Sequence, residues 1–168
     1  MMKKLKNNKG YTFVEMMACV VILLLVALIS GTGMNLALNN YNQQVFESDS
    51  QMLEATLNMH LGDILRHTTS VTEADGAVTG ITNSSYQIYN GAITVEDGVF
   101  YIVKNAEDPA VHMVNEATYL NNLYVDNFTL TYDASTGVFS GTYTIKSNTV
   151  QNASKECTFS YRRIYWNN

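Results

Sequence analysis

The stretch KGYTFVEMMACVVILLLVALI, residues 9–29, determines how the rest of the sequence is interpreted. From residue 16 to residue 29 the thiol of Cys19 is the one polar side chain, and no charged residue occurs between Met16 and Phe46. With the apolar residues on either side, the stretch reaches the length of about 20 residues that a helix needs to cross a bilayer. Four lysines in residues 1–10 predict that the N-terminus stays in the cytoplasm and that the rest of the chain lies outside it.

Composition and charge exclude several classes of protein. Charged residues make up only 15% of the 168 residues, against about 25% in an average soluble protein. The net charge is −5, and without its first ten residues the chain would keep six basic and 15 acidic side chains, a net charge of −9. This balance argues against a general nucleic-acid binder. Two cysteines are too few for a disulfide-dense scaffold or a four-cysteine zinc site.

Three ordinary explanations of the apolar stretch compete, and each of them leaves one feature of the sequence unexplained. A secretory signal peptide needs small residues at two alternate positions after the stretch, but the candidate Ser30 has Leu28 in the second position. A lipoprotein signal fails because the apolar residues follow Cys19 instead of preceding it. A plain membrane anchor leaves Glu15 unexplained, since a carboxylate near the bilayer centre costs about 2.5–3.5 kcal/mol.

Residues 9–15, followed at once by the apolar stretch, resemble the prepilin leader of type IV pilins and type II secretion pseudopilins. In that family a basic leader ends in Gly, a prepilin peptidase cuts after it, and the new N-terminus is methylated. The resemblance therefore implies cleavage after Gly10, methylation of Tyr11, and a role in assembly for Glu15, five positions after the Gly. The family usually has Phe where this chain has Tyr11, a change that keeps the ring and adds a hydroxyl.

The resemblance also implies a function and partners. Cleavage would create an amine on Tyr11 that meets Glu15, either in the same helix or in a neighbouring subunit, and a partner charge makes a buried carboxylate tolerable. The chain would be a structural subunit of a prokaryotic filament, not an enzyme, and would need no cofactor. Its partners would be the prepilin peptidase, other pilin or pseudopilin subunits through the N-terminal helix, and the cytoplasmic membrane platform. It would cross the membrane once before assembly and then lie in a surface filament.

The end of the apolar stretch departs from many pilins, which have a helix-breaking Pro there. This chain has Gly31-Thr32-Gly33 instead, and each Gly in a helix interior costs about 1 kcal/mol relative to Ala. The two glycines could soften the helix locally, or they could allow a tight contact between helices. The sequence leaves both readings open.

A helical pattern continues to about residue 67. Apolar residues recur every four positions on one stripe, as expected for an amphipathic helix that covers a core. The stripe comprises Tyr41, Val45, Leu53, Leu57, Leu61 and Leu65, with Met52 and Ile64 alongside. We predict one helix over residues 12–67 and three segments: a leader (1–10), a transmembrane or filament-core helix (11–38), and a helix half with a β-rich head (39–168).

After residue 68 the pattern changes to short alternating runs separated by turn signals such as Asp75-Gly76, Asn90-Gly91, Asp97-Gly98 and Thr136-Gly137. Strands are predicted at 77–81, 86–89, 92–95, 99–103, 123–132, 138–146 and 155–164, with a loop at 106–121. Alternating apolar rows should face the helical stripe. The predicted fold is α+β and pilin-like, with a long N-terminal helix packed on an antiparallel sheet.

Few residues suggest other chemistry. Asp63 and His67 lie four residues apart and His60 seven before His67, so a metal site is conceivable, but a solvated helix face is favoured. No HExxH, Walker A or GxSxG pattern occurs. Bases and aromatics at residues 161–166 could stack on single-stranded nucleic acid, but the end of an exposed strand is favoured. Cys19 and Cys157 are expected to lie too far apart to pair.

The sequence indicates the type of filament subunit less specifically than it indicates the family. Residues 50–53 and 61–66 resemble the helix-to-head junction of minor pilins and of minor components of type II secretion, which favours a minor over a major subunit. A competence pseudopilin for DNA uptake is a variant of this interpretation. The rival from another class is a membrane-tethered extracellular binding module such as an adhesin, which would need the anchor but neither Gly10 nor Glu15.

Overall fold

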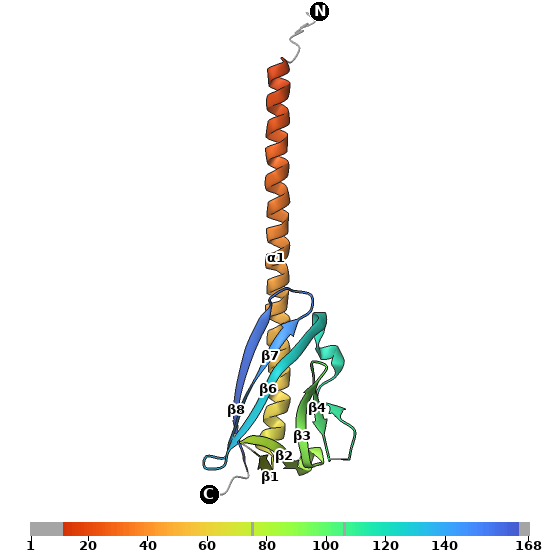
Figure 1. Cartoon of the computed structure of the whole chain (residues 1–168), viewed down its shortest axis with the longest axis vertical. Coiled ribbons are helices and arrows are strands. Elements are labelled where there is room, and N and C mark those ends of the chain that lie inside the picture. The colour runs from red at the N-terminus through yellow and green to blue at the C-terminus, as the bar shows by residue number, and fades with distance from the viewer. Residues whose placement is uncertain (1–11, 75, 106, 165–168) are drawn as a thin grey trace, which may run out of the picture. The chain divides into compact units, whose positions relative to one another are not determined.

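A single long helix, α1 (Phe13–Arg66), begins the described part of the chain and confirms the predicted helix. The computed structural model describes residues 12–74, 76–105 and 107–164, and these form one α-helix, eight β-strands and three short 3-10 helices. The chain divides into two compact units, residues 1–42 and residues 43–168. The first unit holds the apolar part of α1, and the second holds the rest of α1 and all described strands (Figure 1).

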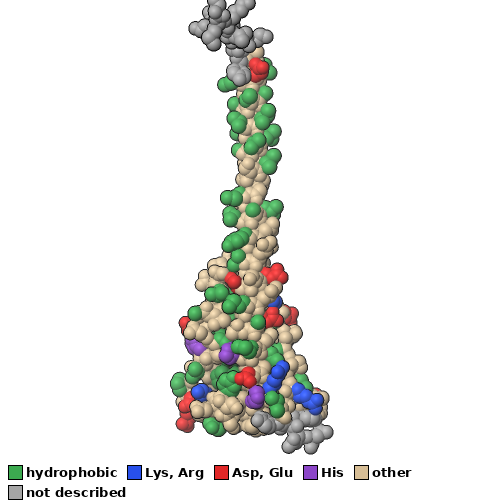
Figure 2. All heavy atoms as spheres, turned by 180° about the vertical axis from the view of Figure 1, so that it is seen from behind, with side chains coloured by type: hydrophobic (Ala, Val, Ile, Leu, Met, Phe, Trp, Pro, Cys, Tyr) green, Lys and Arg blue, Asp and Glu red, His purple; other side chains and the backbone are tan. Residues whose placement is uncertain are grey.

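The apolar side chains of α1 in the first unit are exposed and are not covered by any other part of the chain that the structure describes. Phe13 is 78% exposed, Leu23 67% and Ile29 71%, and Figure 2 shows apolar side chains along the visible face of this part of the helix. This helix is long and apolar enough to cross a membrane. Because burying apolar surface is the main favourable term in folding, a helix with this surface requires lipid or other apolar helices around it.

In the second unit α1 buries one stripe of its surface. Leu53, Leu57, Leu61, Ile64 and Leu65 are fully buried, as the repeat of apolar residues predicts. The prediction was wrong for two residues of its list. Tyr41 belongs to the first unit and is 64% exposed, and Met52, one position from the buried stripe, is 61% exposed.

The strands form two antiparallel sheets. The first has the order β1-β2-β3-β4-β5 and the second the order β6-β7-β8. Their bounds are β1 Ser70–Ala74, β2 Ala77–Asn83, β3 Ile88–Glu96, β4 Val99–Val103, β5 Val111–His112, β6 Leu123–Asp133, β7 Val138–Ser147 and β8 Ser154–Arg162. The observed architecture, a helix packed against antiparallel sheets, is the predicted pilin-like α+β fold.

Two of the predicted hairpins are confirmed by the strand register. Glu96 pairs with Val99 across the turn at Asp97-Gly98, whose residues have φ angles of 49° and 81°, as a two-residue type I′ turn requires. Ala74 pairs with Ala77 across the turn that contains Gly76. Strong turn dipeptides therefore located these connections without knowledge of the tertiary fold.

Three sequence predictions were wrong because distant residues decide the local structure. Asn90-Gly91 is no hairpin turn but lies inside the continuous strand β3, where Asn90 has a φ of 54°. Side chains from β1 and β2 hold Asn90 there, since Thr72 donates to its Oδ1 (3.0 Å) and its own N–H donates to the Thr82 hydroxyl (3.2 Å). Strand β1 was not predicted, and the predicted loop 106–121 contains β5 and two 3-10 helices, Glu116–Thr118 and Leu120–Asn122.

Aromatic side chains fill the space between the helix and the second sheet. Phe139 and Tyr143 of β7 are fully buried, and Phe159 of β8 is 7% exposed. The Tyr143 hydroxyl donates to Oδ1 of Asn58 on α1 (3.1 Å), and burial raises the pKa of Tyr143. The predicted row on β6 is less well covered, because Phe128, Leu130 and Tyr132 are half-buried and pack at the margin of the core.

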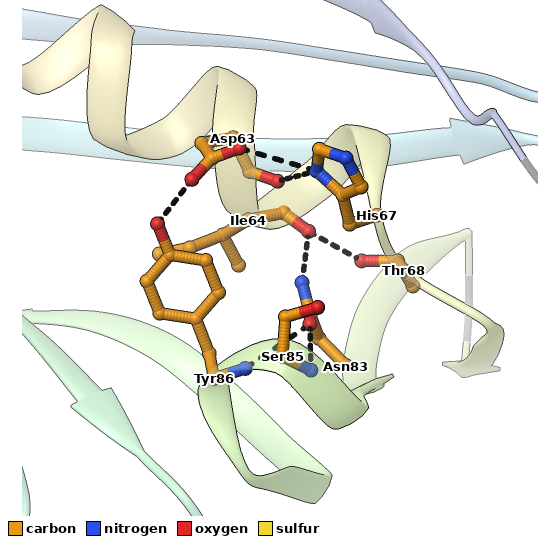
Figure 3. A network of polar contacts seen from close by, with 7 residues as sticks. All are labelled: Asp63, Ile64, His67, Thr68, Asn83, Ser85 and Tyr86. Carbon is orange, nitrogen blue, oxygen red and sulfur yellow. Dashed lines mark hydrogen bonds and ion pairs between the residues drawn. The ribbon is translucent and has the colours of Figure 1, made fainter.

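The C-terminal end of α1 is fixed by a network of polar contacts (Figure 3). The Ile64 carbonyl accepts hydrogen bonds from Nδ2 of Asn83 (2.7 Å) and from the Thr68 hydroxyl (3.0 Å). Oδ1 of the fully buried Asn83 accepts the backbone N–H groups of Ser85 (3.0 Å) and Tyr86 (3.3 Å). The last carbonyls of a helix have no partner within the helix, so this asparagine joins the end of α1 to the first sheet.

We expect Asn83→Ala to lower the free energy of unfolding by about 1–3 kcal/mol, because it leaves buried polar groups of the network without partners. Thermal unfolding followed by circular dichroism measures the effect. Asn148→Ala is the matched control, since Asn148 is exposed and its loss should change stability by less than about 0.5 kcal/mol. Equal melting temperatures for the two variants would show that the Asn83 network does not stabilise the fold.

We also expect a fragment of residues 39–168 to be soluble and to unfold cooperatively, because its core excludes the apolar stretch. In this fragment Leu57→Asp should abolish the folded state, since an unpaired buried charge costs several kcal/mol. Met52→Asp places the same charge on the exposed face of the same helix and should leave the melting temperature nearly unchanged. Similar losses in both variants would contradict the assigned helix face.

Candidate functional site

The segment predicted to be processed and assembled lies at the start of α1. Gly10 and Tyr11 are outside the described residues, so their predicted cleavage and methylation stay predictions. Thr12 is the first described residue, and the helix begins at Phe13. Glu15 therefore occupies the first turn of α1, where a carboxylate is favoured by the positive end of the helix dipole.

Thr12 and Glu15 form a capping box. Oε2 of Glu15 accepts the backbone N–H of Thr12 (2.8 Å) and the Thr12 hydroxyl (2.9 Å), while the N–H of Glu15 donates to the Thr12 hydroxyl oxygen (3.3 Å). These bonds satisfy donors that the helix start would otherwise leave unpaired. The sequence reasoning missed Thr12, although the pattern Thr-x-x-Glu before an apolar run is a known signature of this box.

This geometry shows how a carboxylate is accommodated beside an apolar helix. Two donors from Thr12 stabilise its charged form, which lowers the cost of placing it near lipid. Both of these bonds go to Oε2, and within residues 12–164 as the structure describes them no donor bonds to Oε1, so this oxygen can accept from another group. A positively charged amine close to the start of the helix would be such a donor.

Gly31 and Gly33 lie inside the continuous helix α1. A Cβ atom added at either position would meet no other heavy atom of the described chain within 4 Å. The hydroxyls beside them bond to carbonyls of the preceding turn, Ser30 to Val26 (2.8 Å) and Thr32 to Ile29 (3.0 Å). Hydroxyl bonds of this kind weaken and often bend helices. Softening and tight packing both stay predictions about the assembled state.

The structure brings together two of the three residues considered for a metal site. Oδ1 of Asp63 lies 3.2 Å from Nδ1 of His67, and Tyr86, which the sequence reasoning missed, donates its hydroxyl hydrogen bond to Oδ2 of Asp63 (Figure 3). This bond to a carboxylate raises the pKa of Tyr86 to about 12. Among the described residues, no group of three or more His, Cys, Asp or Glu side chains is placed to hold a metal ion.

Part of the basic and aromatic C-terminal stretch makes contacts that stabilise the fold. The Arg163 guanidinium donates to the carbonyls of Thr68 (3.0 Å) and Thr69 (2.7 Å) and to the Tyr132 hydroxyl (3.0 Å). This arginine therefore ties the end of β8 to the chain that leaves α1, which agrees with the favoured reading of a final strand. Trp166 and its neighbours lie outside the described residues.

The two cysteines are both free, as predicted. Cys19 is exposed on the apolar part of α1, whereas Cys157 is buried in β8. Burial raises the pKa of Cys157 to about 11, so its thiol is protonated at neutral pH and is a poor nucleophile.

Comparison with known proteins identifies the N-terminal segment. Residues 5–31 match the prokaryotic N-terminal methylation motif, a range that contains Gly10, Tyr11 and Glu15. A search of curated proteins and a search of solved structures each found no match. The motif is typical of type IV pilins and pseudopilins, which are structural subunits and not enzymes, and it implies processing by prepilin peptidase. The chain is thus a type IV pilin-like protein with an N-terminal methylation leader.

Proposed function

We propose that the chain is a structural subunit of a prokaryotic type IV pilus or of a type II secretion-like pseudopilus. The observation that carries this proposal is the position of the methylation motif, which runs directly into a helix whose apolar side chains are exposed. A leader of this kind gives the chain a processing site, and the exposed helix gives it a surface for packing. An adhesin on a plain anchor would require neither Gly10 nor Glu15.

We infer the following order of events. The chain is inserted with its lysine-rich N-terminus in the cytoplasm and α1 in the membrane. Prepilin peptidase cuts after Gly10, and Tyr11 becomes the methylated N-terminus. The membrane platform then moves the subunit into the filament, where residues 11–38 form the core and residues 39–168 form the head. Gly31 and Gly33 would soften the helix during this transfer, since glycine lowers helix stability.

Glu15 is proposed to guide assembly by pairing with the N-terminal amine of a neighbouring subunit. The capping box supports this role, because it holds the carboxylate at the start of the helix within reach of an amine placed there. In a dry filament core, each charge would lower the cost of burying the other. The resemblance of residues 50–66 to minor pilins supports a minor subunit, and a competence pseudopilin would use the same steps.

We expect Gly10→Val to block processing, because a bulky residue at the cleavage position does not fit a peptidase that accepts Gly. Cells that express this variant should accumulate a membrane-bound precursor with all four leader lysines, detectable by the mass of the intact chain. A matched change two positions earlier, Asn8→Val, should leave cleavage intact. Normal maturation of Gly10→Val would contradict the assigned cleavage site.

We expect Glu15→Val to keep or improve retention in the membrane, since it removes a carboxylate that costs about 2.5–3.5 kcal/mol near the bilayer centre. Incorporation into filaments should fall by at least about tenfold, because the partner of the neighbouring amine is lost. Filaments sheared from cells and quantified by immunoblot measure this. Glu47→Val, at an exposed acid of the same helix, is the control. Equal incorporation of Glu15→Val and wild type would show that intersubunit pairing is not required.

A further inference from the structure

An open cleft of about 480 Å³ lies in the head beside the last turns of α1. One wall is the exposed side of the helix around His60 and Asp63, and the others come from Tyr86 and from Tyr161 near the end of β8. This volume is in the range of small-ligand sites. The cleft lies wholly within residues 43–168, so its role goes beyond the proposed filament function and does not depend on it.

The position of Tyr161 in the cleft is set by the backbone of α1. The ring lies close over Gly62, where a Cβ atom would come within 3.0 Å of its Cε1 atom, so a larger residue would displace it. Its hydroxyl donates to the Asn58 carbonyl (2.8 Å). Met59 and Ile164 add apolar surface at the rim and are 64% and 59% exposed. The cleft therefore offers a fixed aromatic ring with an apolar margin.

The cleft contains a cation with which an anion could pair. The Arg66 guanidinium lies 5.3 Å from the centroid of the Tyr161 ring, and among the described residues no ion pair involves it. The carboxylate of Asp63 also lines the cleft, and its two oxygens contact Tyr86 and His67. His60 lines the cleft as well. Arg66 is therefore the group to which an anion would bind.

We propose that this cleft binds a carboxylate-bearing sugar. Arg66 would hold the carboxylate, because guanidinium groups pair with carboxylates through two parallel hydrogen bonds. The faces of tyrosine rings carry negative charge density that attracts the C–H groups of a sugar ring. His60 would accept or donate hydrogen bonds with the hydroxyls, and Nδ2 of Asn58, whose two oxygens accept from Tyr143 and Tyr161, would donate one.

Other ligand classes fit the cleft less well. A purely aliphatic acid would need a closed apolar pocket, which this open and partly polar cleft does not provide. A nucleic acid would need several phosphate contacts, but the chain carries a net charge of −5.

The test is a titration of the full-length protein in detergent with trigalacturonate, followed by calorimetry, with neutral galactotriose and succinate as comparison ligands. Trigalacturonate should bind, and the neutral sugar and the plain dicarboxylate should bind at least about tenfold more weakly. Arg66→Gln and His60→Ala should each weaken trigalacturonate binding, Arg66→Gln by at least about tenfold. Lys104→Gln removes a cation outside the cleft and should change nothing.

The melting temperature of each variant shows whether it is folded, and two separate variants keep the test valid if one of them is not. The proposal is overturned if trigalacturonate fails to bind at millimolar concentration. It is equally overturned if galactotriose or succinate binds as tightly, or if the folded Arg66 and His60 variants bind like wild type.

Discussion

The constraint on which the whole molecule depends is the apolar surface of the first part of α1. A helix satisfies its own backbone hydrogen bonds, but it does not bury its own side chains, and Leu23 and Ile29 are not covered by any other described residue of the chain. Only lipid or further apolar helices can remove this surface from water. The same segment can therefore exist in a membrane and in a bundle of its own kind, and that is the physical basis for a subunit that moves from one to the other.

The two ends of the helix use polar side chains in complementary ways. At the start, Thr12 bonds to one oxygen of Glu15 with two donors, which stabilises the carboxylate beside an apolar helix. At the end, Asn83 and Arg163 bond to carbonyls at and beyond the last turn and join the helix to both sheets. The polar contacts at the second end fix the fold, whereas we propose that the carboxylate at the first end binds a neighbouring subunit.

Local signals in the sequence predicted the parts of the fold that local forces decide. The helix from residue 13 to residue 66 and the hairpin at Asp97-Gly98 follow from periodicity and turn chemistry. The path of β3 through Asn90 could not be predicted, because Thr72 of β1 and Thr82 of β2 hold it. Of the candidate site residues, the leader and Glu15 could be predicted because they form a sequence motif. The hydrogen bond from Tyr86 to Asp63 could not, because it joins residues 23 positions apart in the sequence.

The proposed filament function depends most directly on what the N-terminus becomes in the cell. Mass spectrometry of the protein purified from native membranes and filaments measures this without any substitution. We expect a chain that starts at Tyr11 and carries one additional methyl group on its N-terminal amine. An assembled protein that still starts at Met1 would contradict the proposed function.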